Sequence, residues 1–186
     1  RDFCLSRGLG DVYKRQLRDV ARRTDLIAAS RLNSASDLYL KTENLQVTGS
    51  FKVRGAYYKI SQLTAEERAK GVIACSAGNH AQGVAYAAHR FGIPATIVMP
   101  KTAPIAKAKA TEGYGANVVL AGDCYDDAYA KACEICEQEH ATFLHPYNDP
   151  EVIAGQGTLG LEILGDLPTA DILSLIHISE PTRQAE

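Results

Sequence analysis

From residue 72 to residue 164 the sequence alternates short apolar runs with longer segments that carry apolar residues at helical spacing. The short runs predict strands at Val72–Cys75, Ala95–Met99, Asn117–Leu120 and Thr142–His145. The longer segments predict helices at Asn79–Phe91, Pro104–Glu112, Tyr125–His140 and Glu151–Leu164. Strands that alternate with helices across short connections predict an α/β fold, with a mainly parallel sheet and helices on both of its faces.

The segment before this alternation is less regular. Leu38–Lys41 alternates and predicts a strand, whereas Leu17–Ser30 predicts a short helix followed by a turn. Phe51–Leu63 has apolar residues close to helical period, and Ser50 is placed to cap its first turn. Thr64–Glu67 has the spacing of a capping box, which predicts one more short helix.

The composition excludes several classes of protein. Hydrophobic residues make up 46% of the chain, charged residues make up 23%, and the formal net charge is −2. A chain without a basic excess has no field that attracts nucleic acid or an anionic membrane. No apolar run is long enough to span a bilayer, and the amino-terminal residues do not form a secretory signal. We therefore expect no nucleic acid or membrane partner and a location in the cytoplasm.

The five cysteines are odd in number and irregularly spaced, so they do not predict a disulfide framework. Cys133 and Cys136 form a lone Cys-x-x-Cys pair inside a predicted helix. A structural zinc site would need a second pair of ligands. We interpret this pair as helix packing in preference to redox chemistry, and we predict no metal site.

The most informative lysine is Lys52, which lies between Phe51 and Val53 in the predicted first turn of a helix. A lysine amine attacks an aldehyde only when it is neutral, so a Schiff-base lysine needs a depressed pKa. The positive end of a helix dipole and neighbouring apolar side chains both disfavour the ammonium form. A lone lysine is usually a solvated surface residue, so a catalytic assignment for Lys52 depends on a second motif.

That second motif, Cys75–Gly83, leaves a predicted strand and opens a predicted helix. Unpaired N–H groups at such a junction point outward and form an anion site, and Gly78 lets a ligand approach the backbone. An ordinary strand–helix turn capped by Ser76 and Asn79 explains the same residues equally well.

The two motifs, SFKVRGA at Ser50–Ala56 and CSAGNHAQG at Cys75–Gly83, closely resemble those of the threonine dehydratases. These are pyridoxal 5′-phosphate (PLP) enzymes of the tryptophan-synthase-like fold, fold type II, and the resemblance extends from about Leu38 to Leu164. It implies PLP as the cofactor, a small amino acid as the substrate and a homo-oligomeric parent protein.

The resemblance also implies roles for individual residues. Lys52 would bind PLP as a Schiff base and act as the catalytic base, Phe51 would pack on the cofactor ring, and Asn79 would contact the pyridine 3′-oxygen. The loop that would hold the substrate carboxylate consists of Ser76, Ala77, Gly78, Asn79 and His80.

The activity implied is deamination of L-threonine to 2-oxobutanoate and ammonia, and of L-serine to pyruvate. Serine racemases usually carry a serine at the position of Ala77, where it serves as a second base. Alanine cannot move a proton, which favours deamination. The alternatives are a serine racemase, another β-eliminating enzyme of fold type II, or a truncated α/β domain without catalytic activity.

Several other residues carry weaker expectations. We expect Arg54 to pair with an acid such as Glu43. His145 and Asn148 follow a predicted strand and are candidates for substrate contacts. The last predicted helix contains three glycines that suggest close backbone packing, namely Gly155, Gly157 and Gly160.

The two ends of the chain have an unusual relationship at the level of DNA. One set of codons for SRGLGDVYKRQ, residues 6–16, has a reverse complement that encodes LSLIHISEPTR, residues 173–183. This DNA also resembles an adapter of transposase-based sequencing libraries. We expect residues 1–16 and 173–186 to be translated artefact and residues 17–172 to be a fragment of a longer catalytic region.

Within that fragment, the resemblance implies a complete small domain at about residues 45–150, with parts of a large domain on either side. In the family, a run of glycines after the next strand binds the PLP phosphate, and this sequence does not contain it. We therefore expect the chain as written to bind PLP poorly.

Overall fold

The computed structural model describes residues 17–32 and 36–174. Its main sheet is entirely parallel, with the strand order β5-β4-β3-β6. The strands are β3 (Val72–Cys75), β4 (Ala95–Met99), β5 (Asn117–Leu120) and β6 (Thr142–Phe143). All four strands lie where the sequence predicted them, and the parallel α/β fold is confirmed.

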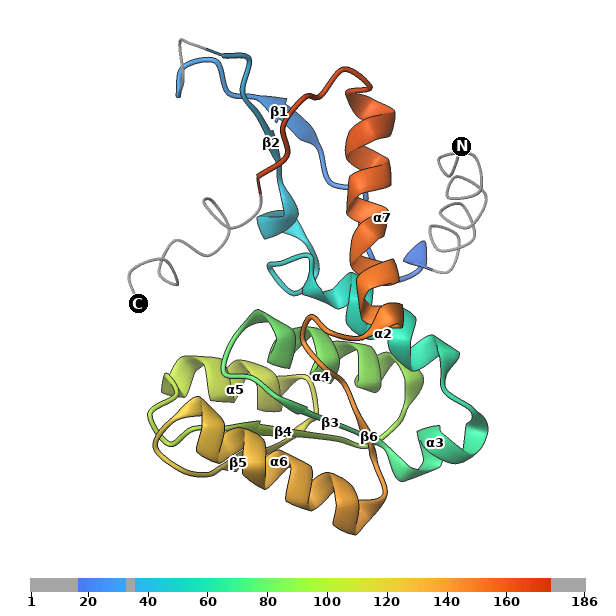
Figure 1. The fold of residues 1–186 in the computed structure, drawn as a ribbon, viewed down its shortest axis with the longest axis vertical. Coiled ribbons are helices and arrows are strands. Elements are labelled where there is room, and N and C mark those ends of the chain that lie inside the picture. Colours follow the sequence, from blue (N-terminus) through green and yellow to red (C-terminus); the bar gives the residue numbers. More distant parts are fainter. Residues whose placement is uncertain (1–16, 33–35, 175–186) are drawn as a thin grey trace.

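Helices cover both faces of this sheet, as expected (Figure 1). On one side lie α4 (Asn79–Phe91) and α5 (Ile105–Gly113), and on the other side lies α6 (Tyr125–Glu139). Strand β3 is a continuous apolar run in the sequence because both of its faces are buried. Its alternate residues Val72 and Ala74 belong to the core beneath α4, whereas Ile73 and Cys75 face Ala128 and Ala132 of α6.

A second layer stands on the α4 side of the sheet. It contains α2 (Lys52–Gln62), which packs against α4 and against α7 (Pro150–Asp166), while α3 (Ala65–Lys70) leads from α2 into β3. The long helix α7 extends away from the sheet beside a small antiparallel pair (Figure 1). This pair consists of β1 (Leu26–Ala28) and β2 (Tyr39–Lys41), and the short helix η1 (Glu43–Leu45) follows it.

Helices α2 and α7 cross where each has a glycine. A Cβ atom added to Gly155 would lie 2.6 Å from the Arg54 carbonyl oxygen and 2.7 Å from Gly55 Cα. Close packing at Gly155 is therefore confirmed. The same prediction is wrong for Gly157 and Gly160, because a Cβ at either position would meet no atom within 4 Å. Only one face of α7 meets α2, so only one of the three glycines reaches the crossing.

Two local predictions fail at the start of the chain. Leu17–Ser30 was expected to form a helix and a turn, but its second half forms β1, which pairs with β2 from Leu26–Lys41 to Ala28–Tyr39. Ser50 does not cap α2, because Phe51 takes the N-cap position with no side-chain cap, and the buried Ser50 hydroxyl has no partner among the described residues. By contrast, the predicted capping box of Thr64 and Glu67 is present at α3.

The expectations for residues 1–16 and 175–186, and for Cys4, lie outside the described residues. Among the residues that are described, no helix is long and apolar enough to cross a membrane.

Candidate active site

Lys52 is the first residue of α2, and its half-buried side chain reaches the loop that follows β6. Its Nζ donates a hydrogen bond to the Pro146 carbonyl oxygen at 3.1 Å and lies 5.4 Å from the centre of the Phe51 ring. The backbone of Lys52 rests on α4 at Gly83, where an added Cβ would lie 3.0 Å from the Lys52 carbonyl carbon. The glycine thus lets the first turn of α2 approach α4 closely.

The predicted anion loop is the connection from β3 to α4. The Ser76 N–H donates to the Val98 carbonyl at 3.1 Å and extends the pairing of β3 with β4, while the Gly78 N–H donates to Ser76 Oγ at 3.2 Å. Helix α4 begins at Asn79, with Gly78 as its N-cap. Ser76–Asn79 is half-buried, whereas His80 and Ala81 in the first turn of α4 are buried. The first N–H groups of a helix have no acceptor within the helix itself. This arrangement suits the binding of a small anion.

His80 differs from the rest of the loop because its ring is buried. Its Nε2 donates to the Leu144 carbonyl at 3.0 Å, which leaves Nδ1 as an acceptor with no partner in the described part of the chain. Burial lowers the pKa of His80 to about 4, and the nearby Lys52 adds to the lowering, against the opposing effect of the Leu144 hydrogen bond. An acceptor atom repels a carboxylate, so any contribution of His80 to an anion site belongs to its backbone N–H.

The loop between β6 and α7 forms the other side of the site. His145 is half-buried, and its Nδ1 accepts hydrogen bonds from the N–H groups of Tyr147 at 3.3 Å and Asn148 at 2.8 Å. The loop ends at Asp149, whose carboxylate caps α7 and pairs with Lys59 of α2 at 3.0 Å. The contacts of His145 and Asn148 with a substrate stay predictions.

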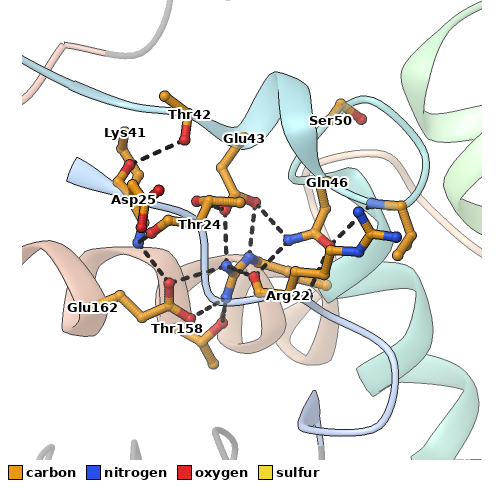
Figure 2. A network of polar contacts seen from close by, with 12 residues as sticks. Arg22, Thr24, Asp25, Lys41, Thr42, Glu43, Gln46, Ser50, Thr158 and Glu162 are labelled. Atoms are coloured by element: carbon orange, nitrogen blue, oxygen red, sulfur yellow. Dashed lines mark hydrogen bonds and ion pairs between the residues drawn. The ribbon is translucent and has the colours of Figure 1, made fainter. Parts of the chain in front are cut away.

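Arg54 lies two residues beyond Lys52, is buried, and bonds to Glu43, Thr158 and Glu162. Figure 2 shows these three partners within one polar network. The Arg54 guanidinium contacts both carboxylate oxygens of Glu43 at 2.8 and 2.9 Å, and both of Glu162 at 2.7 and 3.1 Å. Lys41 contacts Glu162 at 2.8 Å, so two cations and two carboxylates balance. The predicted pairing of Arg54 with Glu43 is confirmed.

The charges of this network support one another. Burial opposes the charge on Arg54, but hydrogen bonds to Glu43 and Glu162 outweigh it and hold the pKa of Arg54 above its ordinary value. Burial likewise opposes the charge on Glu162, and the hydrogen bonds from Arg54 and Lys41 lower its pKa in spite of that. The network joins η1, β2 and α7 to the turn of α2 that carries Lys52.

Sequence reasoning missed three parts of this arrangement. The Pro146 carbonyl could not be anticipated, because a backbone oxygen has no signature in a sequence. Lys41 looked like an ordinary alternating strand residue. Glu162 had a usable signal, because it is a lone acid on the buried side of an otherwise apolar helix, and buried carboxylates require partners.

The described cysteines are not bonded to one another. Cys75 is buried at the end of β3, and burial raises the pKa of its thiol to about 11. Cys136 packs against the core beneath α6, and its thiol donates to the Ala141 carbonyl at 3.0 Å, in accordance with the predicted helix packing. Within residues 17–32 and 36–174, no group of three or more His, Cys, Asp or Glu side chains could hold a metal ion.

The chemistry available at this place is that of an amine beside an anion site. Lys52 supplies a primary amine, which can form an imine with an aldehyde or carry a proton. The first turn of α4 supplies N–H groups for an anion. Phe51 supplies an aromatic surface next to the amine.

Comparison with known proteins identifies the family in which this arrangement occurs. The family model described as "Pyridoxal-phosphate dependent enzyme" matches residues 17–176. The L-threonine ammonia-lyase of Thermotoga maritima is 56% identical over 162 residues, which cover 86% of this chain and 40% of that protein.

Solved structures give the same result. The processed form of threonine deaminase isoform 2 from Solanum lycopersicum superposes with a TM-score of 0.82 at 41% identity, over 90% of this chain and 47% of that one. Maize serine racemase superposes with a TM-score of 0.83 at 32% identity, over 88% and 50% of the two chains. The chain therefore spans about half the length of these relatives. The matches confirm the predicted fold type II architecture, and the chain belongs to the family of pyridoxal-phosphate-dependent enzymes.

Proposed function

We propose that this chain carries the lysine-bearing part of a PLP-dependent ammonia-lyase that converts L-threonine to 2-oxobutanoate and ammonia, and L-serine to pyruvate and ammonia. The observation that carries the proposal is that the Lys52 amine, bonded to the Pro146 carbonyl, acts electrostatically on the His80 ring in the first turn of α4, while the Lys52 backbone packs on Gly83 of the same helix. The 56% identity with the Thermotoga maritima L-threonine ammonia-lyase supports this substrate.

The residues present fit one end of PLP. The Lys52 amine is half-buried and suited to a covalent bond with the cofactor aldehyde, Phe51 lies beside it, and Asn79 begins α4. The buried Ser50 hydroxyl has no partner in the described structure and directly precedes Phe51, so one more donor is available there. When bound, PLP would supply an electron sink for the negative charge that develops at the substrate Cα.

The protein's own groups would perform the remaining steps. The N–H groups of the Ser76–His80 loop would bind the α-carboxylate and fix the orientation of Cα. The Lys52 amine would accept the Cα proton, and the β-hydroxyl would leave as water. Addition of one water and loss of ammonia then complete the conversion of L-threonine to 2-oxobutanoate.

Serine racemisation is the second candidate, since maize serine racemase shares the fold at 32% identity. Racemisation needs a proton carrier on each face of Cα. Ala77, in the candidate carboxylate loop, has no ionisable group, which favours elimination. Measuring D-serine and pyruvate formed from L-serine distinguishes the two activities.

A chimera tests the proposal directly. Residues 17–172 of this chain would replace the corresponding segment of the Thermotoga maritima relative, which supplies the rest of the protein. We expect the chimera to release 2-oxobutanoate from L-threonine and the Lys52→Ala variant to lose roughly three orders of magnitude in rate. Lys70→Ala, at an exposed lysine paired with Glu66, is the matched control and should retain the activity.

A chimera that folds and binds PLP but deaminates neither threonine nor serine would contradict the proposal. Reduction of the chimera with borohydride in the presence of PLP gives a second test. A pyridoxyl group fixed on Lys52 supports a catalytic lysine, and its absence supports a domain without catalytic activity. An uninterrupted read of the source gene across both ends tests separately whether residues 1–16 and 173–186 are translated adapter.

A further inference from the structure

The Pro146–Tyr147 peptide bond is held from both sides. Its carbonyl oxygen accepts a hydrogen bond from Lys52 Nζ at 3.1 Å, and its N–H donates to His145 Nδ1 at 3.3 Å. No cis peptide bond occurs among the described residues, and the C=O and N–H of a trans peptide point in opposite directions in one plane. A ligand on the N–H side therefore determines where the carbonyl on the other side points.

The rest of the loop leaves this plane little freedom. The ring of Pro146 fixes its φ angle, so the direction of its carbonyl depends on ψ alone. The Asn148 N–H also donates to His145 Nδ1, at 2.8 Å, which closes a tight turn around the imidazole. On its amino-terminal side, the Leu144 N–H donates to the Ile73 carbonyl at 2.8 Å. Among these four hydrogen bonds, the two that a side chain of the loop itself makes both end on His145 Nδ1.

The His145 ring is itself fixed by aromatic neighbours. It meets the Tyr147 ring edge to face, with ring centres 4.5 Å apart at 88°, and it lies 6.5 Å from the Phe143 ring. Such contacts favour a single ring orientation. Since Nδ1 accepts two N–H groups, the imidazole there carries no proton on that nitrogen.

We propose that His145 is a positioning residue for Lys52. By holding the Tyr147 and Asn148 N–H groups, it turns the Pro146 carbonyl toward the lysine and keeps the amine beside the beginning of α4. The carbonyl is an acceptor only, so it stabilises the ammonium form of Lys52 and restrains the amine until a ligand displaces it. The inference depends on the proposed function only in that Lys52 is the reactive group.

Two substitutions separate the acceptor of His145 from its ring. His145→Phe keeps an aromatic ring against Tyr147 and Phe143 but removes the acceptor. His145→Asn removes the ring but keeps an oxygen at the second position from Cβ, close to the place of Nδ1. If the acceptor atom of His145 positions the loop, His145→Phe loses the orientation of the Pro146 carbonyl toward Lys52, and His145→Asn keeps it.

The measurement is the reactivity of Lys52 toward formaldehyde and cyanoborohydride, resolved by peptide mass spectrometry on the full chain. This reagent needs no cofactor and measures the availability of the neutral amine. We expect methylation of Lys52 to be roughly tenfold faster in His145→Phe than in the unsubstituted protein, because the carbonyl no longer stabilises the ammonium. His145→Asn should react at the original rate, and the exposed Lys101 and Lys107 should not change in either variant.

Every other pattern overturns the inference. Equal rates at Lys52 in all three proteins would show that His145 does not control the carbonyl. Equal acceleration in both variants would show that the ring matters and the acceptor does not. Amide hydrogen exchange of the unsubstituted chain gives an independent check, because the exposed Asn148 N–H must be protected if it is bonded to His145. None of these results depends on deamination, so the proposed function can fail separately.

Discussion

Arg54 of α2 and Glu162 of α7 meet in a two-point contact, with nitrogen–oxygen distances of 2.7 and 3.1 Å. The backbone of Arg54 lies where the two helices cross at Gly55 and Gly155, and its guanidinium reaches Glu162 farther along α7. Glu43 completes the arrangement from the opposite side of the guanidinium. The turn of α2 that carries Lys52 is thus tied both to η1, just before it in the sequence, and to the distant helix α7.

Removal of the Arg54 side chain should destabilise the fold strongly. Arg54→Ala leaves Glu43 and Glu162 buried with too little positive charge, and we expect a loss of about 3–5 kcal/mol in the free energy of unfolding by urea. Arg54→Lys should recover only part of this, because an ammonium cannot reproduce the planar fork. Lys131→Ala, at an exposed pair with Glu134, is the control and should leave the midpoint unchanged. An Arg54→Ala midpoint equal to that of the control would show that the buried contacts of Arg54 with Glu43 and Glu162 do not stabilise the fold.

The free energy of unfolding should decrease as the pH is lowered from 6.5 to 4, because of His80. The pKa of His80 is about 4 in the folded state and near its ordinary 6.5 in the unfolded state, so the unfolded chain binds the extra proton in this window. The stabilising contribution is complete above pH 6.5 and is lost progressively toward pH 4, by roughly 3 kcal/mol. The measurement is urea unfolding across this range.

His80→Gln supplies the comparison for that experiment. Glutamine keeps a donor for the Leu144 carbonyl but does not titrate, so the slope between pH 6.5 and pH 4 should become shallower. The same slope in both proteins would mean that His80 is not the group that titrates.

Two alanine substitutions in α7 should have opposite effects. A Cβ at Gly155 would lie 2.6 Å from the Arg54 carbonyl oxygen, so we expect Gly155→Ala to lower the free energy of unfolding by about 1–3 kcal/mol. Gly157 is exposed with no atom within 4 Å of an added Cβ. Gly157→Ala should raise stability by up to about 1 kcal/mol, since alanine favours the helix. Thermal unfolding followed by circular dichroism compares the two, and a destabilised Gly157→Ala would contradict the described packing.

Asp149 should contribute to stability both as a cap and as an ion-pair partner. It accepts the N–H groups of Glu151 and Val152 at 2.9 and 3.1 Å and pairs with Lys59. Asp149→Ala should cost about 1–2 kcal/mol. Asp149→Asn keeps an oxygen for the cap and should cost less. If the two variants unfold at the same temperature, the ion pair with Lys59 and not the cap is the main contribution.

Local signals predicted much of the fold correctly. The strands from β3 to β6 and the capping box at Thr64 were recognisable because each depends on residues that are near one another in the chain. Strand β1 was missed because its three residues carry too little alternation, and only the pairing with β2 makes them a strand. The cap assigned to Ser50 failed because Phe51 already has a helical conformation, and Ser50 then lies one residue too early.

In the candidate site, too, the features that depend on short segments were predicted from the sequence. The motifs around Lys52 and Asn79 located the first turns of α2 and α4, because helix starts and the chemistry of a lysine amine are properties of short segments. The residue roles that the resemblance implied for Phe51 and Asn79 remain predictions that the chimera can test.

The sequence by itself determined the order of the strands and helices from α2 to α7 and the two family motifs, and it singled out Lys52 as the candidate reactive lysine. The tertiary structure alone decided which groups surround that lysine. Pro146 lies 94 residues from Lys52, and Glu162 lies 108 residues from Arg54. Helical period and capping depend on neighbours within a few positions. Contacts over such separations form only when the burial of apolar surface brings distant segments together, and buried polar groups must then find partners in whatever that packing places beside them.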